Sequence, residues 1–135
     1  MKIHHRQLYP KDQSLLEAFL LQRLESSMFL YSNMKHSGLV DGDSPYQGLY
    51  FGSFQNGQLV GVVAHYWNGL ILVQAQEELS SLLNLLTQVS NRPIKGVIGL
   101  WEQVCKAKEI LSLSDDVLSY KSKEKLYHLG GPNKY

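Results

Sequence analysis

Hydrophobic residues alternate with short polar turns over residues 46–89, and the rest of the chain is organised around this stretch. Three runs rich in β-branched and aromatic residues occur within it, at positions 48–54, 59–66 and 70–73. This composition favours β-strands. The pairs Asn56-Gly57 and Asn68-Gly69 separate the runs, and both residue types tolerate the positive φ angles of a type I′ turn. The pattern therefore predicts three consecutive antiparallel strands.

A helix is predicted directly after the third run, because the spacing of apolar residues becomes helical at Gln76. One face of residues 76–90 carries five regularly spaced apolar side chains, those of Leu79, Leu82, Leu83, Leu86 and Val89. Pro93 ends this helix, since the residue before a proline is biased away from helical angles. The apolar run at 94–99 is short and follows a helix, so we expect a buried strand parallel to an earlier one.

The N-terminal residues 3–9 alternate loosely and end at Pro10, which is typical of a short edge strand. The pair His4-His5 lies within this strand and raises the possibility of a metal site. Neighbouring side chains of a strand point to opposite faces of the sheet. We therefore expect that the two imidazoles do not share one ion, and we expect no metal site in the chain.

Two helical segments are predicted between this strand and the hairpins. Asp12 is a suitable N-cap for the first, whose apolar stripe consists of Leu15, Leu16, Phe19 and Leu20. We expect Ser26-Ser27 to interrupt the helix. A second segment over residues 28–35 is expected to end at Gly38, a residue type common just after a helix C-terminus.

The C-terminal part predicts a further helix from Trp101, with Cys105 among apolar neighbours and therefore in the core. The mixed run at 118–129 favours a strand near 126–129, and we expect residues 130–135 to form a short flexible tail. The predicted order is β-α-α-β-β-β-α-β-α-β. This order indicates an α/β fold, a mixed sheet of five to seven strands with helices on both faces, in one domain over residues 1–129.

The composition limits the function only broadly. The chain has 135 residues, of which 44% are hydrophobic and 19% charged, as in ordinary globular proteins. Its net charge of +1 argues against nucleic acid as a partner, and its single cysteine excludes a disulfide framework. No apolar run reaches the roughly 20 residues of a membrane span. We therefore expect a cytoplasmic protein that binds no membrane.

Candidate chemistry is sparse in the residues themselves. His65 lies in the second run of the hairpins, where we expect a buried structural histidine. Asp41 and Asp43 flank a glycine as in a calcium loop, but the remaining ligand positions of such a loop are missing. No Ser-His-Asp order, phosphate loop or metal cluster is visible in the sequence.

The order of elements resembles the fold of GCN5-related N-acetyltransferases. Three segments are also similar to the N-terminal portion of bacterial two-part acetyltransferases, namely residues 25–33, Tyr50-Phe51-Gly52 and residues 97–101. In those proteins a degenerate first half precedes a second half that carries the acetyl-donor site. The resemblance implies that this chain corresponds to the first half.

The resemblance also implies where acetyl-CoA would bind. In the family the fourth strand separates from the fifth, and the exposed backbone binds the pantetheine arm. The corresponding residues here are Val73, Gln74 and Ala75. The loop that follows lacks the glycines and the arginine that bind pyrophosphate in the family. Instead, Glu77 and Glu78 place negative charge in the expected first turn of the helix, where it repels a pyrophosphate.

Catalytic residues are not identified by the resemblance. Family members often use a tyrosine near the last helix as acid and a glutamate as base. Tyr127 and Glu102 are the available residues, but neither lies in a matching motif. The catalytic residues therefore stay unknown.

Two hypotheses follow. The first is a non-catalytic acetyltransferase-like module that binds a second domain of this kind or its own copy as a homodimer. The alternative is an acetyl-CoA-dependent N-acetyltransferase acting on an amine, in which Arg92 or Lys95 binds the phosphates of the cofactor. The acidic, glycine-free loop favours the module.

Overall fold

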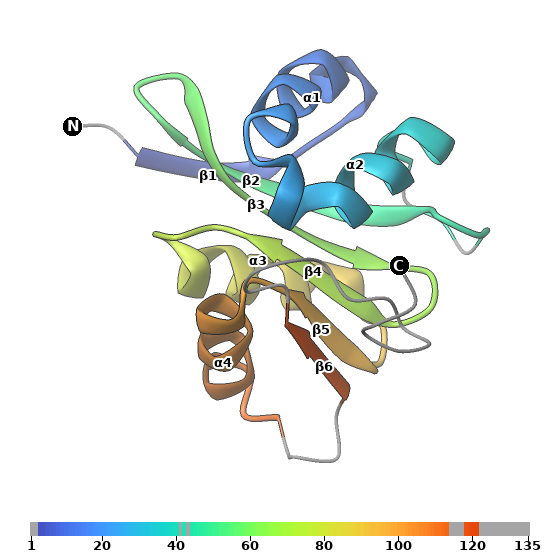
Figure 1. Cartoon of the computed structure of the whole chain (residues 1–135), viewed down its shortest axis with the longest axis vertical. Helices are drawn as coiled ribbons and strands as arrows, with labels where there is room; N and C mark the ends of the chain where they lie inside the picture. Colours follow the sequence, from blue (N-terminus) through green and yellow to red (C-terminus); the bar gives the residue numbers. More distant parts are fainter. Residues whose placement is uncertain (1–2, 41, 43, 114–117, 122–135) are drawn as a thin grey trace.

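The computed structural model describes residues 3–40, 42, 44–113 and 118–121 (Figure 1). Within them, six strands form one sheet in chain order. The strands are β1 (Ile3–Gln7), β2 (Gly48–Gln55), β3 (Gln58–Tyr66), β4 (Leu70–Gln74), β5 (Gly96–Gly99) and β6 (Leu118–Lys121). The helices are α1 (Gln13–Leu21), α2 (Leu24–Ser37), α3 (Leu79–Ser90) and α4 (Trp101–Ile110), and a short 3-10 turn (Pro10–Asp12) precedes α1.

The sheet is mixed. The pairs β1–β2, β2–β3 and β3–β4 are antiparallel, as hairpins require, whereas β4–β5 and β5–β6 are parallel. The helix α3 provides the crossover from β4 to β5, which parallel neighbours need. The α/β fold class, the position of β1 at the edge of the described sheet and the buried parallel strand β5 are confirmed.

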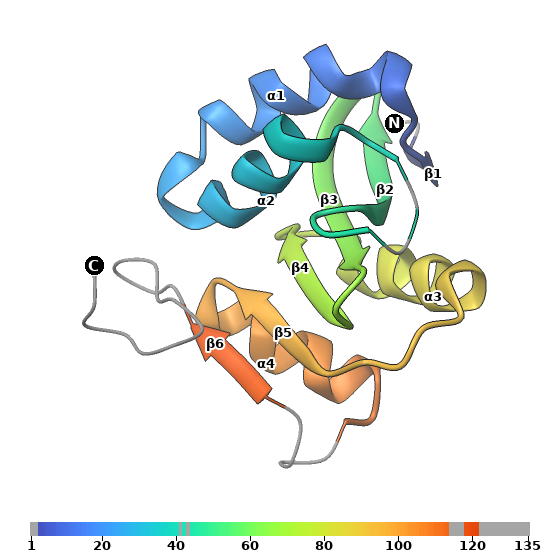
Figure 2. The ribbon, with the colours of Figure 1, turned by 90° about the vertical axis from the view of Figure 1, so that its right-hand side faces the viewer.

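Helices cover both faces of the sheet. Figure 2 shows α1 and α2 on one side of the strands and α3 and α4 on the other. The first face buries a core that includes Leu16, Leu20, Leu30, Met34 and Tyr50. The second face buries a core that includes Leu82, Leu83, Leu86, Val97 and Val104. Burial on both faces explains why the strands are continuous apolar runs rather than alternating ones.

The two hairpin turns differ. Asn56 and Gly57 both have positive φ angles, 53° and 84°, so the predicted type I′ turn is confirmed there. At the second turn only Gly69 has a positive φ angle, 86°, and its N–H donates to the Tyr66 carbonyl at 2.9 Å. The type I′ prediction is therefore wrong at Asn68. The loop is a type I turn followed by a left-handed glycine, a common three-residue hairpin.

The break between the first two helices differs from the prediction, whereas the end of α2 agrees with it. The break between α1 and α2 lies at Gln22-Arg23, and Ser26-Ser27 lies inside α2, because both serine hydroxyls find a partner in the sheet. The end of α2 at Gly38, with a φ angle of 67°, is confirmed.

Asp12 is the N-cap residue of α1, as predicted, but its side chain makes no capping hydrogen bond to this helix. Its carboxylate accepts hydrogen bonds from Arg6 at 2.9 Å and from the Tyr9 N–H at 2.8 Å. The carboxylate therefore joins β1 to the turn before α1.

The C-terminal predictions are confirmed only in part. Helix α4 begins at Trp101 as predicted, but Cys105 is exposed, and the buried face consists of Gln103, Val104 and Ala107. A strand exists at β6, whereas the predicted strand at 126–129 and the tail at 130–135 lie outside the described residues.

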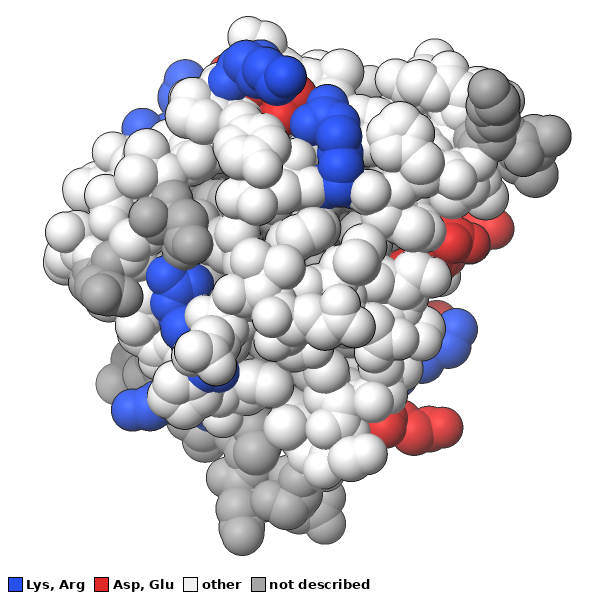
Figure 3. Space-filling model, turned by 180° about the vertical axis from the view of Figure 1, so that it is seen from behind, with Lys and Arg blue, Asp and Glu red and all other residues white. Residues whose placement is uncertain are grey.

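Figure 3 shows the side of the molecule opposite to Figure 1. On that side, Lys and Arg side chains of the described residues lie singly or in small groups and form no continuous basic surface. None of the helices in the described part of the chain is long and apolar enough to cross a membrane. The absence of a nucleic-acid partner stays a prediction.

Candidate functional site

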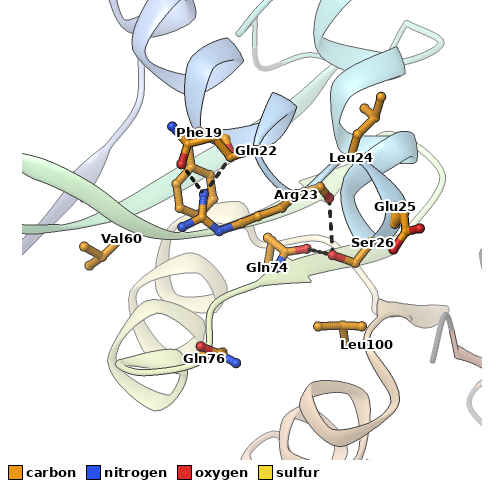
Figure 4. Close-up of a pocket in the computed structure, with 10 residues that line it drawn as sticks. All are labelled: Phe19, Gln22, Arg23, Leu24, Glu25, Ser26, Val60, Gln74, Gln76 and Leu100. Atoms are coloured by element: carbon orange, nitrogen blue, oxygen red, sulfur yellow. Dashed lines mark hydrogen bonds between the residues drawn. The ribbon is translucent and has the colours of Figure 1, made fainter. Parts of the chain in front are cut away.

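A cavity of about 480 Å³ lies at the carboxyl end of β4, beside the junction of α1 and α2 (Figure 4). Its walls come from that junction, from β3 and β4 and from the start of α4. They are formed by Phe19, Gln22, Arg23, Leu24, Glu25, Ser26, Val60, Gln74, Gln76 and Leu100. In open α/β sheets, ligands bind outside the carboxyl ends of parallel strands, so this cavity is the first candidate site.

Two further cavities adjoin the first. One, of about 340 Å³, lies beside the first turns of α4, and the other, of about 370 Å³, lies at the beginning of α3. Gln76 lines all three cavities, and Lys106 lines the last two. Together they follow the carboxyl ends of β4 and β5, and we call them the β4 cleft.

The predicted cofactor residue Val73 lies just beyond the last hydrogen-bonded pair of β4 and β5, which joins Leu72 to Ile98. The chain does not open a gap at this point. A Cβ atom on Gly99 would lie 2.6 Å from Val73 Cγ2 and 2.8 Å from the Val73 carbonyl oxygen. Only glycine permits this approach, and it keeps Val73 covered on the β5 side.

The second predicted residue, Gln74, is buried with 5% of its surface exposed. Its side-chain oxygen accepts hydrogen bonds from the Ser26 and Ser27 hydroxyls, each at 2.8 Å. Ser27 is itself buried. The three side chains therefore satisfy one another and tie the first turn of α2 to the end of β4, as buried polar groups require.

The third predicted residue, Ala75, offers a backbone N–H that the family would use for pantetheine. Here that N–H donates to the Gln103 side-chain oxygen at 2.9 Å. Gln103 is 5% exposed and Ala75 is 1% exposed, so the bond is shielded from water. A ligand that claimed this N–H would have to displace a buried amide and leave it unpaired, at a cost of about 1–3 kcal/mol.

The beginning of α3 carries acidic residues, although the helix starts later than predicted. Glu78 is the N-cap, with a left-handed φ angle of 64°, so Glu77 and Glu78 precede the first turn rather than lie in it. The Glu78 carboxylate lies 3.3 Å from His5 Nε2. His5 thus faces α3, while His4 stacks on the Phe54 ring at 5.7 Å, so the predicted separation of the two imidazoles is confirmed.

The basic residues proposed for the phosphates lie elsewhere. Arg92 donates to the carbonyls of His65 and Gly42, at 2.8 and 3.0 Å. Lys95 packs beside the turn at Gly69, which is the amino end of β4. Both are therefore remote from the β4 cleft, and the prediction that either serves phosphates there is wrong.

Two basic residues of the β4 cleft were not predicted as site residues. Lys106 follows Gln103 by three residues on α4, and this spacing places both on the same side of the helix, toward the cleft. Arg23 lines the first cavity, where its guanidinium lies 4.0 Å above the Phe19 ring and donates to the Phe19 carbonyl at 2.9 Å. Figure 4 shows this stacked pair beside Gln74.

The candidate catalytic side chains form no acid–base pair in the described part of the chain. Glu102 is exposed at the wall of the cleft beside α4, and Tyr127 lies outside the described residues. His65 is fully buried, with Nδ1 2.8 Å from the Ser90 hydroxyl and Nε2 3.2 Å from the Pro93 carbonyl, so its predicted structural role is confirmed. The described residues contain no group of three or more His, Cys, Asp or Glu that could hold a metal.

Comparison with known proteins gives one remote structural match. No family model matches the chain, and no curated protein matches it. Among solved structures, it is similar to an aminoglycoside acetyltransferase from an uncultured soil metagenomic sample, with 15% sequence identity and a TM-score of 0.41. The match covers 73% of this chain and 78% of that chain. At this similarity it carries no argument about a substrate or a cofactor.

Proposed function

We propose that this chain is a non-catalytic acetyltransferase-like module whose β4 cleft binds a second domain of this kind, which in isolation is a second copy of the chain. The proposal rests on the β4 joint, our name for the hydrogen-bonded side chains of Ser26, Ser27, Gln74 and Gln103 at the end of β4. Gln103 occupies the Ala75 N–H, and Gly99 covers Val73. The backbone groups that would hold a pantetheine arm are therefore used to hold the fold together.

Exposed apolar side chains around the cleft support a protein partner. Leu24 and Met28 are 36% and 50% exposed and lie one turn apart on α2. Trp101, 38% exposed, lines the neighbouring cavity at the start of α4. Apolar groups with a polar rim mark interaction surfaces, and Arg23 and Glu25 supply polar neighbours.

The test is the oligomeric state of the purified chain by size-exclusion chromatography with light scattering. We expect a dimer, and we expect Met28→Lys to weaken it at least about tenfold, since a charge would be buried at the contact. Val89→Lys is the matched control, because Val89 is 51% exposed and lies on α3, across the sheet. A monomer at every concentration, or equal weakening by both variants, would contradict the proposal.

An acetyl-CoA-dependent N-acetyltransferase is the second candidate, and one observation favours it. The β4 cleft follows the carboxyl ends of two parallel strands, and Lys106 lies where α3 begins. If this activity exists, Lys106→Gln lowers acetyl-CoA affinity by about tenfold, as for one charged contact. Glu109→Gln, an exposed change on the same helix, leaves the affinity unchanged.

A further inference from the structure

A separate cavity of about 170 Å³ lies at the amino end of β4, between α2 and the turn that joins β3 to β4. Among the described residues, none lines both this cavity and the β4 cleft. Aliphatic side chains of β4 and β5 form its base. Its other walls are the rings of Phe29, Tyr46, Tyr66 and Trp67 and the amides of Asn33 and Asn68.

The rings meet at steep angles around Trp67. The Tyr46 ring lies 5.1 Å from the Trp67 ring at an interplanar angle of 55°. The Tyr66 ring lies 6.3 Å from it at 73°. Rings arranged in this way form adjoining walls of a box rather than a flat stack, so more than one π-face can border a small ligand.

Tyr46 reaches this box through an unusual backbone conformation. Its φ angle is 70°, which is a rare, strained value for a bulky residue. Hydrogen bonds pin the next residue, since the Gln47 N–H donates to the Ser44 carbonyl at 3.0 Å and the Trp67 N–H donates to the Gln47 carbonyl at 2.9 Å. The His36 ring packs against Tyr46 at 4.3 Å. The surrounding contacts therefore maintain the strained backbone angle, and this angle positions the Tyr46 ring in the cavity wall.

The described part of the lining has no ionised side chain. Among the residues that the structure describes, no Lys, Arg, Asp or Glu lines the cavity. Burial raises the pKa of the Tyr66 hydroxyl well above its usual value, and this hydroxyl donates to the Tyr50 hydroxyl at 2.7 Å. Tyr66 thus stays neutral at physiological pH, and the ring faces are the electronegative surface that the cavity offers.

We propose that this aromatic cavity binds a methylated ammonium group. The faces of Trp and Tyr attract a cation, and a methylated ammonium loses less hydration than a primary ammonium when it enters a site without carboxylates. The cavity is well below the usual volume of a drug-sized site, roughly 300–1,000 Å³, so it suits a head group rather than a large molecule. This proposal is independent of the module proposal.

The test is a titration of choline into the full chain, followed by NMR of the two indole N–H signals. We expect a saturable shift of the Trp67 signal, with the Trp101 signal as a control in the same spectrum. 3,3-Dimethyl-1-butanol, the uncharged isostere of choline, should bind at least about tenfold more weakly if the charge is recognised. Equal affinity for both compounds, or the lack of a saturable Trp67 shift, would overturn the proposal.

Substitutions at Tyr46 test the contribution of its ring. Asparagine accepts left-handed angles, so Tyr46→Asn should keep the fold while it lowers choline affinity by about fivefold. Tyr46→Phe keeps the ring and should keep the affinity. Tyr9→Asn is the matched control, since Tyr9 is 47% exposed and Tyr46 39%. Unchanged choline affinity in Tyr46→Asn would overturn the role of this ring and with it the proposed cage.

Discussion

At its carboxyl end β4 meets the polar side chains of the β4 joint, whereas at its amino end it borders an aromatic cavity whose described lining has no Lys, Arg, Asp or Glu. In the joint, the polar side chains bond one another, and Gln74 and Gln103 fill positions that a ligand would need. At the aromatic end, aromatic rings that include those of Tyr46 and Trp67 line a cavity of about 170 Å³. The difference indicates that the polar joint serves stability, and that the aromatic end retains room for a ligand.

The largest expected effect is at Gln74. Gln74→Leu removes the acceptor of two serine hydroxyls, and the buried Ser27 hydroxyl loses its partner. We expect the free energy of unfolding to fall by about 2–3 kcal/mol, measured by urea denaturation. Gln76→Leu is the control two residues further on, where the side chain is exposed and the change should stay within about 0.5 kcal/mol. Equal effects of the two variants would show that the joint is not a structural unit.

The next effect is at Gln103. Gln103→Leu leaves the Ala75 N–H buried without a partner, so the free energy of unfolding should fall by about 2 kcal/mol. The same variant frees the backbone N–H of Ala75, so it also tests whether the Gln103 side chain prevents a cofactor from binding there. If closure alone prevents cofactor binding, acetyl-CoA should bind this variant and not the native chain. If Gln103→Leu loses stability but still does not bind acetyl-CoA, the acidic residues before α3 would be the main reason that the cofactor does not bind.

A smaller effect is expected at the aromatic end. Tyr66→Phe removes the hydroxyl that donates to Tyr50 but keeps the ring. The free energy of unfolding should fall by about 1 kcal/mol, and choline affinity should not change, because the ring face and not the hydroxyl binds the cation. Tyr31→Phe is the control on α2, because this ring is half-buried and its hydroxyl donates only a long hydrogen bond, of 3.4 Å, to the Glu17 carboxylate. A loss of choline affinity in Tyr66→Phe would show that the hydroxyl, and not only the ring, takes part in binding.

The smallest expected change in the free energy of unfolding concerns the ion pair of Arg6 and Asp12, which is remote from both ends of β4. Hydrogen bonds from Arg6 hold the pKa of Asp12 below its usual value of 3.8. A depressed pKa in the folded state stabilises the fold above the unfolded pKa, and this stability is lost as the pH falls below about 4. Arg6 is 36% exposed, so we expect less than about 1 kcal/mol. Asp12→Asn should lack this acid dependence, and an identical pH profile in both proteins would contradict the assignment.

The sequence predicted the order of elements because that order depends on local signals. Asn56-Gly57 specifies its turn within four residues, and the leucines of α3 specify one buried face. The predicted helix boundaries were wrong where a residue distant in the sequence determines them. Ser26 and Ser27 were expected to break a helix, but Gln74, almost fifty positions away, accepts both hydroxyls and keeps them in α2.

The candidate site was predicted less well, for the same reason. Its location at Val73, Gln74 and Ala75 came from a resemblance, and whether those residues bind a cofactor stays a prediction. The side chains that close the joint come from other elements, and Gln103 has no local signal that relates it to Ala75. The burial of Gln103 also explains the error at Cys105, because a polar residue occupies the inner face of α4 and the cysteine faces outward.

We propose that the joint at the end of β4 holds the fold together and does not bind acetyl-CoA. The most direct test is a calorimetric titration of acetyl-CoA, and separately of CoA, into the purified native chain. We expect no binding heat with either compound at millimolar concentration. A dissociation constant of about 100 μM or tighter, roughly −5.5 kcal/mol, would contradict it and would make Val73, Gln74 and Ala75 the first residues to mutate.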